Sequence, residues 1–167
     1  MDITPEQVLR IALQTARNQE RFSPETIRRL RQANLVILDP WTDELRELFI
    51  DLLLVGHDAI PVFETLDQLD LFVPVLPEWK PARSRPQRNA YHRFTVDRHL
   101  LETAAEASKL ADRVDRPDLL VIGALLHDIG KPYPGDHTEV GMQLINTLAG
   151  RMGFPQADIE IPVSYTH

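Results

Sequence analysis

Cysteine is absent from the sequence, and its absence excludes disulfide bonds, thiolate catalysis and cysteine-ligated zinc or iron–sulfur centres. Histidine and carboxylate side chains remain as the available metal ligands. Long apolar runs are also lacking, because none approaches the roughly 18 to 20 residues that cross a bilayer. The N-terminal residues MDITPEQ contain neither the basic nor the apolar region of a signal peptide. We therefore expect a cytoplasmic protein with no membrane partner.

Positive charge is scarce, with 18 lysines and arginines against 25 acidic residues and a formal net charge of -7. This balance argues against a broad nucleic-acid surface, although it leaves room for a local basic patch. We expect no nucleic-acid partner. The length of 167 residues and the hydrophobic content of 43% are typical of one soluble domain, or of one domain with a short attached layer.

Helix signals recur along the N-terminal half of the chain. Thr4, with Pro5 and Gln7, forms a capping box that predicts a helix over residues 4–18. Ser23 begins a second helix, and Thr42 begins a strongly apolar third helix that closes at Gly56. A short helix follows through Val62, Leu66 and Leu69. These patterns predict an all-α fold with a helical linker region at residues 1–76.

Residues 77–91, PEWKPARSRPQRNAY, have a different composition. They contain three prolines and the basic residues Lys80, Arg83, Arg85 and Arg88, with few aliphatic side chains. We interpret them as an extended, basic, proline-rich connector. Two readings remain open, a solvated linker, which is slightly favoured, and a basic strip, continued by Arg93, for a phosphate-bearing partner.

The central feature of the chain is residues 119–131, LLVIGALLHDIGK. The run up to Leu126 has no polar face, so a helix made from it must be buried on all sides. Gly130 and Pro132 predict that this helix stops just after His127 and Asp128. A carboxylate beside a histidine in apolar surroundings suggests a divalent metal, whereas the plain alternative is that both side chains satisfy backbone groups at the helix end.

Two more histidines are placed where they can approach this pair. A predicted helix over residues 96–114 has His99 on an inward stripe with Val96, Thr103, Ala107, Leu110 and Val114. It forms an antiparallel hairpin with helix 117–128, which brings His99 near His127 and Asp128. A third helix begins at Asp136, and His137 heads its apolar stripe close to the same point.

The order of His99, then His127-Asp128, then Lys131 resembles the HD superfamily of metal-dependent phosphohydrolases. In that superfamily the first histidine, the HD pair and a later aspartate bind one divalent metal, and a histidine like the one in GDHTEVG helps to hold a second. The runs LFVPVLPEW, RNAYHRFTVDRHLLET, LLHDIGK and GDHTEVG further resemble the central region of bacterial PII uridylyltransferase/uridylyl-removing enzymes.

This narrower resemblance implies a helical HD-domain-like bundle at residues 92–167, preceded by the linker layer and the connector. No nucleotidyltransferase signature and no ACT-like β pattern is found in the sequence, so we expect a fragment that stops within its HD domain. The superfamily's last aspartate is expected further on, because Asp158 stands too early. Other domains of a full-length chain are therefore expected partners.

The resemblance implies hydrolysis of the phosphodiester that joins UMP, with AMP as an alternative, to a tyrosine of the PII nitrogen-signalling protein. It assigns His99, His127 and Asp128 to a first metal, and His137 to a second metal or to the phosphate. Asp128 and Lys131 are the catalytic candidates, with Lys131 either a phosphate clamp or a cation at a helix C-terminus. The donor set suits Mg²⁺, Mn²⁺, Zn²⁺ or Fe.

Two alternatives stay open. One is another HD phosphohydrolase that acts on a free nucleotide or a cyclic dinucleotide. The other is a non-catalytic helical regulatory module in which the histidines pack in the core.

Overall fold

The computed structural model describes residues 2–83, 95–130, 135–155 and 157–158, except for the side chains of His137 and Thr138. Within these residues every regular element is helical, which confirms the predicted all-α class. None of these helices is long and apolar enough to cross a bilayer. In chain order the elements are α1 (Pro5–Arg17), α2 (Pro24–Arg31), α3 (Asp43–Val55), η1 (Gly56–Ala59), α4 (Ile60–Gln68), η2 (Pro77–Ala82), α5 (Val96–Ser108), η3 (Ala111–Arg113), α6 (Pro117–Leu126) and α7 (His137–Arg151).

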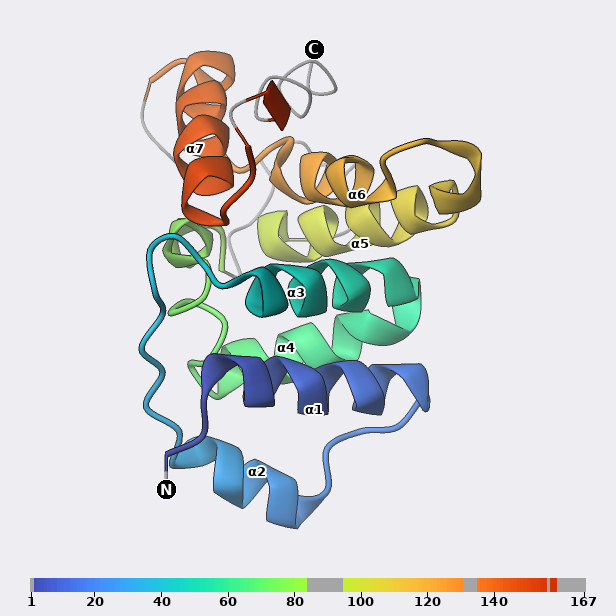
Figure 1. The fold of residues 1–167 in the computed structure, drawn as a ribbon, viewed down its shortest axis with the longest axis vertical. Coiled ribbons are helices and arrows are strands. Elements are labelled where there is room, and N and C mark those ends of the chain that lie inside the picture. The colour runs from blue at the N-terminus through green and yellow to red at the C-terminus, as the bar shows by residue number, and fades with distance from the viewer. Residues whose placement is uncertain (1, 84–94, 131–134, 156, 159–167) are drawn as a thin grey trace.

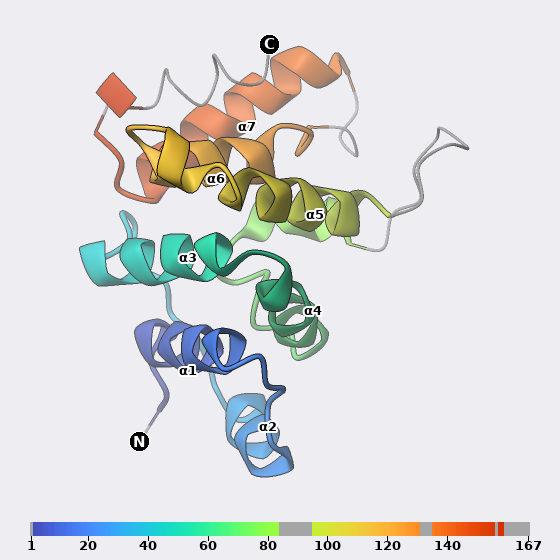
Figure 2. The same ribbon diagram turned by 90° about the vertical axis from the view of Figure 1, so that its right-hand side faces the viewer.

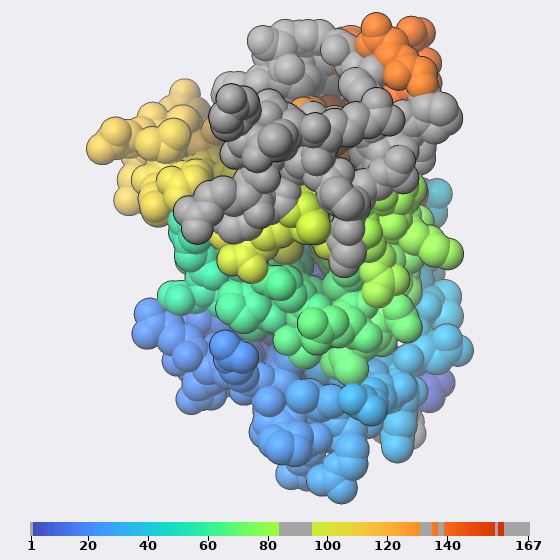
Figure 3. Space-filling view, turned by 180° about the vertical axis from the view of Figure 1, so that it is seen from behind, coloured from blue at the N-terminus to red at the C-terminus, as the bar shows by residue number. Residues whose placement is uncertain are grey.

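The helices are stacked in an order that largely follows the chain. Figures 1 and 2 show α2 at one pole, then α1, then α3 with α4, then the α5–α6 hairpin, with α7 at the opposite pole. The view from behind shows the same gradient, from the N-terminal helices to the α5–α6 hairpin (Figure 3). In this stack α3 packs against α1 on one side and against α5 and α6 on the other.

The predicted helix starts are confirmed by their caps. The Thr4 hydroxyl accepts a hydrogen bond from the Gln7 N–H, and the Gln7 side chain accepts one from the Thr4 N–H. Ser23 and Thr42 cap α2 and α3 in the same way, each accepting a backbone N–H within the first turn. Gly56 ends α3 with a φ of 90°, a conformation that L side chains rarely adopt.

One continuous apolar core joins the N-terminal helices to the α5–α6–α7 region. The α6 helix is buried on nearly all sides, as its sequence predicts, and its buried side chains are Leu119, Val121, Ile122, Leu125 and Leu126. We call the elements from α1 to η2 the N-terminal layer. A chain of aromatic contacts crosses it through Trp41, Phe49, Phe63, Phe72 and Trp79. The core therefore fixes the α5–α6 hairpin against the layer that precedes it.

The prediction of an extended connector is wrong for its first residues. Residues 77–82 form the 3₁₀ helix η2, in which Trp79 is buried with its ring centroid 4.9 Å from that of Phe72. Arg83, expected in a basic strip, forms ion pairs with Asp67 and Asp70. Burial of the Trp79 indole stabilises this folded conformation, whereas an extended connector would leave the indole in water. Residues 84–91 and Arg93 lie outside the described part, and the proposed domain limits stay predictions.

Helix α5 is shorter than the predicted helix 96–114, because it ends at Ser108 and is followed by η3. The hydroxyl of Ser108 donates to the Ala105 carbonyl at 2.6 Å, a local bond that competes with further helix. The predicted inward stripe is also partly wrong. The side chains buried on α5 are Val96, Leu100, Leu101, Ala104 and Ala105, while Leu110 is exposed. His99 lies at the edge of this buried face.

Candidate metal centre

The α5–α6 hairpin brings together side chains from its two chain ends. The two helices lie side by side and antiparallel, so that the start of α5 is next to the end of α6 (Figures 1 and 2). His99 lies in the first turn of α5, where its backbone N–H donates to the Thr95 carbonyl at 2.8 Å. His127 is the C-cap residue of α6, and Asp128 follows it. The predicted antiparallel hairpin is thus confirmed.

The three side chains form one cluster. Oδ2 of Asp128 lies 3.0 Å from Nε2 of His127 and 3.5 Å from Nε2 of His99. The two imidazole rings meet edge to face, with their centroids 5.4 Å apart. One ligand atom from each residue can be chosen so that all three lie within 4.8 Å of one another. Each side chain is about a quarter exposed, at 26% for His99 and 27% for the other two.

The hydrogen bonding of His127 determines which nitrogen faces the carboxylate. Its Nδ1 lies 2.7 Å from the Ala124 carbonyl oxygen. A carbonyl oxygen only accepts, so Nδ1 carries the proton and Nε2 is the nitrogen directed at Asp128. In the neutral ring, Nε2 then presents a lone pair to a carboxylate oxygen, an arrangement that a cation between or beside them stabilises. Two imidazole nitrogens and one carboxylate oxygen therefore fit a divalent metal.

The Ala124 carbonyl is a part of the site that the sequence analysis missed. It belongs to the last turn of α6, where carbonyl groups have no amide partner within the helix. A histidine placed three residues later is within reach of that carbonyl. This local spacing is the signal that would have predicted the orientation of His127.

Other predicted site residues fall beyond what the structure describes. Lys131 lies outside the described residues. His137 begins α7, but its side chain also lies outside the described part. Their roles therefore stay predictions.

The backbone of α7 nevertheless lies beside the residues that follow His127 and Asp128. A Cβ placed on Gly141 would lie 3.9 Å from the backbone nitrogen of Gly130. Asp136 caps the helix, as predicted, because its Oδ1 accepts the Glu139 N–H at 3.1 Å. The first turns of α7 are thus next to the segment that follows Asp128.

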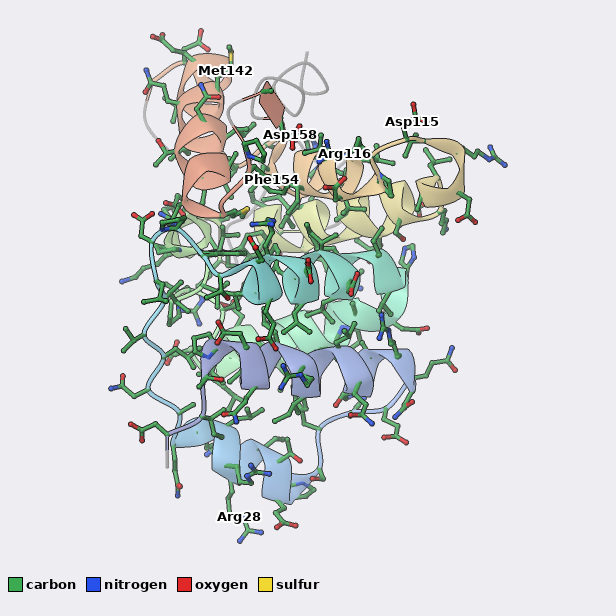
Figure 4. The ribbon with its side chains drawn as sticks, viewed as in Figure 1. Arg28, Asp115, Arg116, Met142, Phe154 and Asp158 are labelled. Carbon is green, nitrogen blue, oxygen red and sulfur yellow. The ribbon has the colours of Figure 1, made fainter. Side chains whose placement is uncertain are left out.

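Asp158 is engaged at the opposite end of α6. Arg116 at the N-cap of α6 donates to both carboxylate oxygens of Asp158 at 3.0 Å, and to those of Asp118 at 2.9 and 3.1 Å (Figure 4). Hydrogen bonds to these two carboxylates raise the pKa of Arg116. Burial alone would raise the pKa of Asp118, but the Arg116 bonds and the backbone amide of Leu119 outweigh it and leave that pKa lowered. Asp158 is therefore not placed to join the metal cluster.

His57 is separate from this centre. Its Nε2 lies 3.1 Å from Glu102 and 3.2 Å from Glu106, and its side chain is 42% exposed. His57 is therefore a partly exposed partner of two α5 carboxylates.

Comparison with known proteins gives the family. The HD domain family matches residues 96–163. Over most of its length the chain is also similar to proteins named bifunctional uridylyltransferase/uridylyl-removing enzyme. It is 44% identical to the one from Streptomyces coelicolor over 153 residues, covering 92% of this chain and 18% of that protein. It is 39% identical to the one from Mycobacterium tuberculosis H37Rv, covering 93% and 19%.

The helical hairpin, the clustered His99, His127 and Asp128, and the family match together define an HD-domain protein. More narrowly, the chain corresponds to the HD portion, with the helical region before it, of the bifunctional uridylyltransferase/uridylyl-removing enzymes. A relative from Ruegeria pomeroyi extends this similarity at 30% identity over 171 residues. The chain spans about a fifth of the length of these relatives, at 18% to 19%.

Proposed function

We propose that this chain forms the HD phosphodiesterase centre of a bifunctional enzyme that removes a nucleotidyl group from the PII nitrogen-signalling protein. The group is UMP, with AMP as an alternative, and the reaction takes place in the cytoplasm. The single observation that best supports hydrolase chemistry is Oδ2 of Asp128 facing Nε2 of both His99 and His127. The substrate class is supported by the uridylyl-removing activity in the relatives' names.

We assign His99, His127 and Asp128 as ligands of one divalent cation, of which Mg²⁺, Mn²⁺, Zn²⁺ and Fe all suit nitrogen and oxygen donors. His137 is assigned to a second cation or to the substrate phosphate, and Lys131 to the phosphate as a clamp. When bound, a divalent cation supplies Lewis-acid chemistry, which activates water and neutralises negative charge on the phosphoryl oxygens.

The chain's own residues prepare this chemistry in three ways. The Ala124 carbonyl holds the Nδ1 proton of His127, so that Nε2, which faces Asp128, is the nitrogen that acts as a ligand. Asp128 supplies negative charge between two imidazoles, where it raises the affinity of the cluster for a cation. The quarter exposure of all three side chains leaves them open to a bulky substrate, as a nucleotidylated protein requires.

The direct test is release of nucleotide from uridylylated PII in the presence of Mn²⁺, followed by chromatography. This chain and the full-length Streptomyces coelicolor relative are assayed in parallel, each also with the aspartate of the HD pair changed to asparagine. We expect UMP release that depends on the metal and on this aspartate. Metal-independent release, or release unaffected by the change, would overturn the proposal.

The same assay separates the alternatives. Free nucleotides and a cyclic dinucleotide are offered under identical conditions. Faster hydrolysis of either than of uridylylated PII would favour a different HD phosphohydrolase. Absence of both metal binding and hydrolysis in this chain and in the relative would favour a regulatory module.

A further inference from the structure

The C-terminal end of α7 is held by a side chain from the N-terminal layer. Arg151, the last residue of α7, donates from Nη1 and Nη2 to Oε1 and Oε2 of Glu78 in η2, at 2.7 and 2.5 Å. The two side chains are only 20% and 13% exposed. The hydrogen bond to Glu78 raises the pKa of Arg151 despite its burial. A two-pronged pair shielded from water fixes both distance and orientation.

The backbone at this end of α7 is fastened as well. The backbone N–H of Trp41 donates to the Arg151 carbonyl at 2.7 Å. Nη1 of Arg46, on α3, lies 3.4 Å from the carbonyl oxygens of both Met152 and Gly153. The Arg46 guanidinium also lies over the ring of Phe154, 5.7 Å from its centroid. The chain before and within α3 thus holds the last turn of α7 and the residues after it.

The N-terminal half of α7 lies beside the segment that follows Asp128 of the metal cluster. Its first turns approach the segment after Asp128 through Gly141 and Gly130, as described above. Figures 1 and 2 show α7 at an angle to the helical stack, with its C-terminal end the end nearest α3. A 15-residue helix is about 22 Å long, so a tilt of about 5° at one end moves the other by about 2 Å. A shift of that size is large for a reaction centre.

We propose that Glu78 and Arg151 are positioning residues, which act through α7 to place its N-terminal turn, including His137, over the cluster of His99, His127 and Asp128. This inference rests on the proposed function, because it gives α7 a part in the same site. The N-terminal layer is then a platform for the HD centre. A conformational change in that layer would move the N-terminal turn of α7 relative to the cluster without displacing His99, His127 or Asp128.

Hydrogen exchange of this chain, with and without Mn²⁺, tests the proposal. In the unmodified chain, Mn²⁺ should slow exchange in the first turns of α7, at residues 139–145. For the Glu78→Gln variant we expect an Mn²⁺ affinity within about threefold of that of the unmodified chain, because the ligands on α5 and α6 are unchanged. The Mn²⁺-dependent protection of residues 139–145 should fall at least fivefold. Arg151→Gln should do the same, and the double variant should be no worse than either single one.

Glu44→Gln is the matched control, because it removes a carboxylate that pairs with Arg10 between α3 and α1, away from α7. It should leave the protection unchanged. The inference is wrong if Glu78→Gln retains the Mn²⁺-dependent protection, or if the two single effects add in the double variant. Should Glu78→Gln fail to fold, Arg151→Lys keeps the charge with fewer donors and should give an intermediate loss.

Failure of the proposed function gives a different result. If the unmodified chain binds no Mn²⁺, the metal assignment fails, and exchange without metal then decides the inference. Faster exchange at residues 139–145 in Glu78→Gln than in Glu44→Gln would support positioning of α7 by the clamp. Equal rates in the two variants would overturn it.

Discussion

Oδ2 of Asp128 lies 3.5 Å from Nε2 of His99, although the two residues belong to different segments of an antiparallel hairpin. The same carboxylate oxygen lies 3.0 Å from Nε2 of the neighbouring residue, His127. The carboxylate is thus the point at which the two ends of the hairpin meet. The contact depends on α6 being buried and on α5 packing along it, so the core of the protein determines the geometry of the site.

Replacement of Asp128 by asparagine should remove metal binding while leaving the fold intact. The amide keeps the size of the side chain but loses its charge, so Mn²⁺ affinity should fall about 100-fold or more, at least matching what loss of a supporting group costs. Electron paramagnetic resonance titration measures the affinity, and circular dichroism checks the helices. Asp158→Asn is the control and should bind Mn²⁺ like the unmodified chain. If Asp128→Asn unfolds, and neither it nor the unmodified chain binds Mn²⁺, the result would support a structural role for Asp128 in core packing.

Truncation of Leu125 should destabilise the whole domain. This side chain is fully buried on α6, two residues before His127. Leu125→Ala leaves a cavity and should lower the free energy of unfolding by about 2–5 kcal/mol. Urea unfolding followed by circular dichroism gives the value. A loss below about 1 kcal/mol would mean that α6 is not the buried centre of the fold.

Two glycine substitutions should change stability in opposite directions. Gly56 has a φ of 90°, and a Cβ there would lie 2.9 Å from Oγ of Ser108. Gly56→Ala should therefore cost about 1–2 kcal/mol or more. Gly150 lies in α7, and a new Cβ there would meet no atom within 4 Å besides its chain neighbours and the helix's own backbone, so Gly150→Ala should stabilise by about 0.5–1 kcal/mol. Thermal unfolding of both variants checks the two signs, and equal signs would contradict the backbone described.

Removal of Arg116 should weaken the protein mainly above acidic pH. Arg116 holds the pKa of Asp118 below its usual value of 3.8, so this stabilisation is present above that value and is lost as pH falls through the folded-state pKa. Arg116 is 44% exposed, and after screening Arg116→Gln should cost about 0.5–1 kcal/mol at pH 7. The difference from the unmodified chain should shrink below pH 3.8. A difference that grows with acid would contradict the assignment.

Local signals predicted the parts of the fold that depend on neighbouring residues. Thr4, Ser23 and Thr42 begin helices because a cap needs only the next turn. The convergence of His99 with Asp128 followed from two further local features, an all-apolar helix and a short turn that makes the hairpin antiparallel. The cluster of His99, His127 and Asp128 was therefore predictable as a geometry, whereas its role as a ligand set stays a proposal.

Features that depend on distant packing were not predictable in this way. The inward face of α5 was misplaced because α3 and α6 both cover it, which buries Leu100 and Ala104 in place of Thr103 and Leu110. Trp79 folds residues 77–82 into the core because Phe72 and its aromatic neighbours provide a place for the indole. The pair of Glu78 and Arg151 joins segments 73 residues apart, and no sequence pattern marks it.

The most direct test of the central claim is anomalous diffraction from crystals of this chain soaked in Mn²⁺. The account predicts a strong anomalous peak between Nε2 of His99, Nε2 of His127 and Asp128, at about 2.0–2.3 Å from each donor atom. Absence of a peak at that position, with metal bound elsewhere or not at all under saturating Mn²⁺, would contradict it.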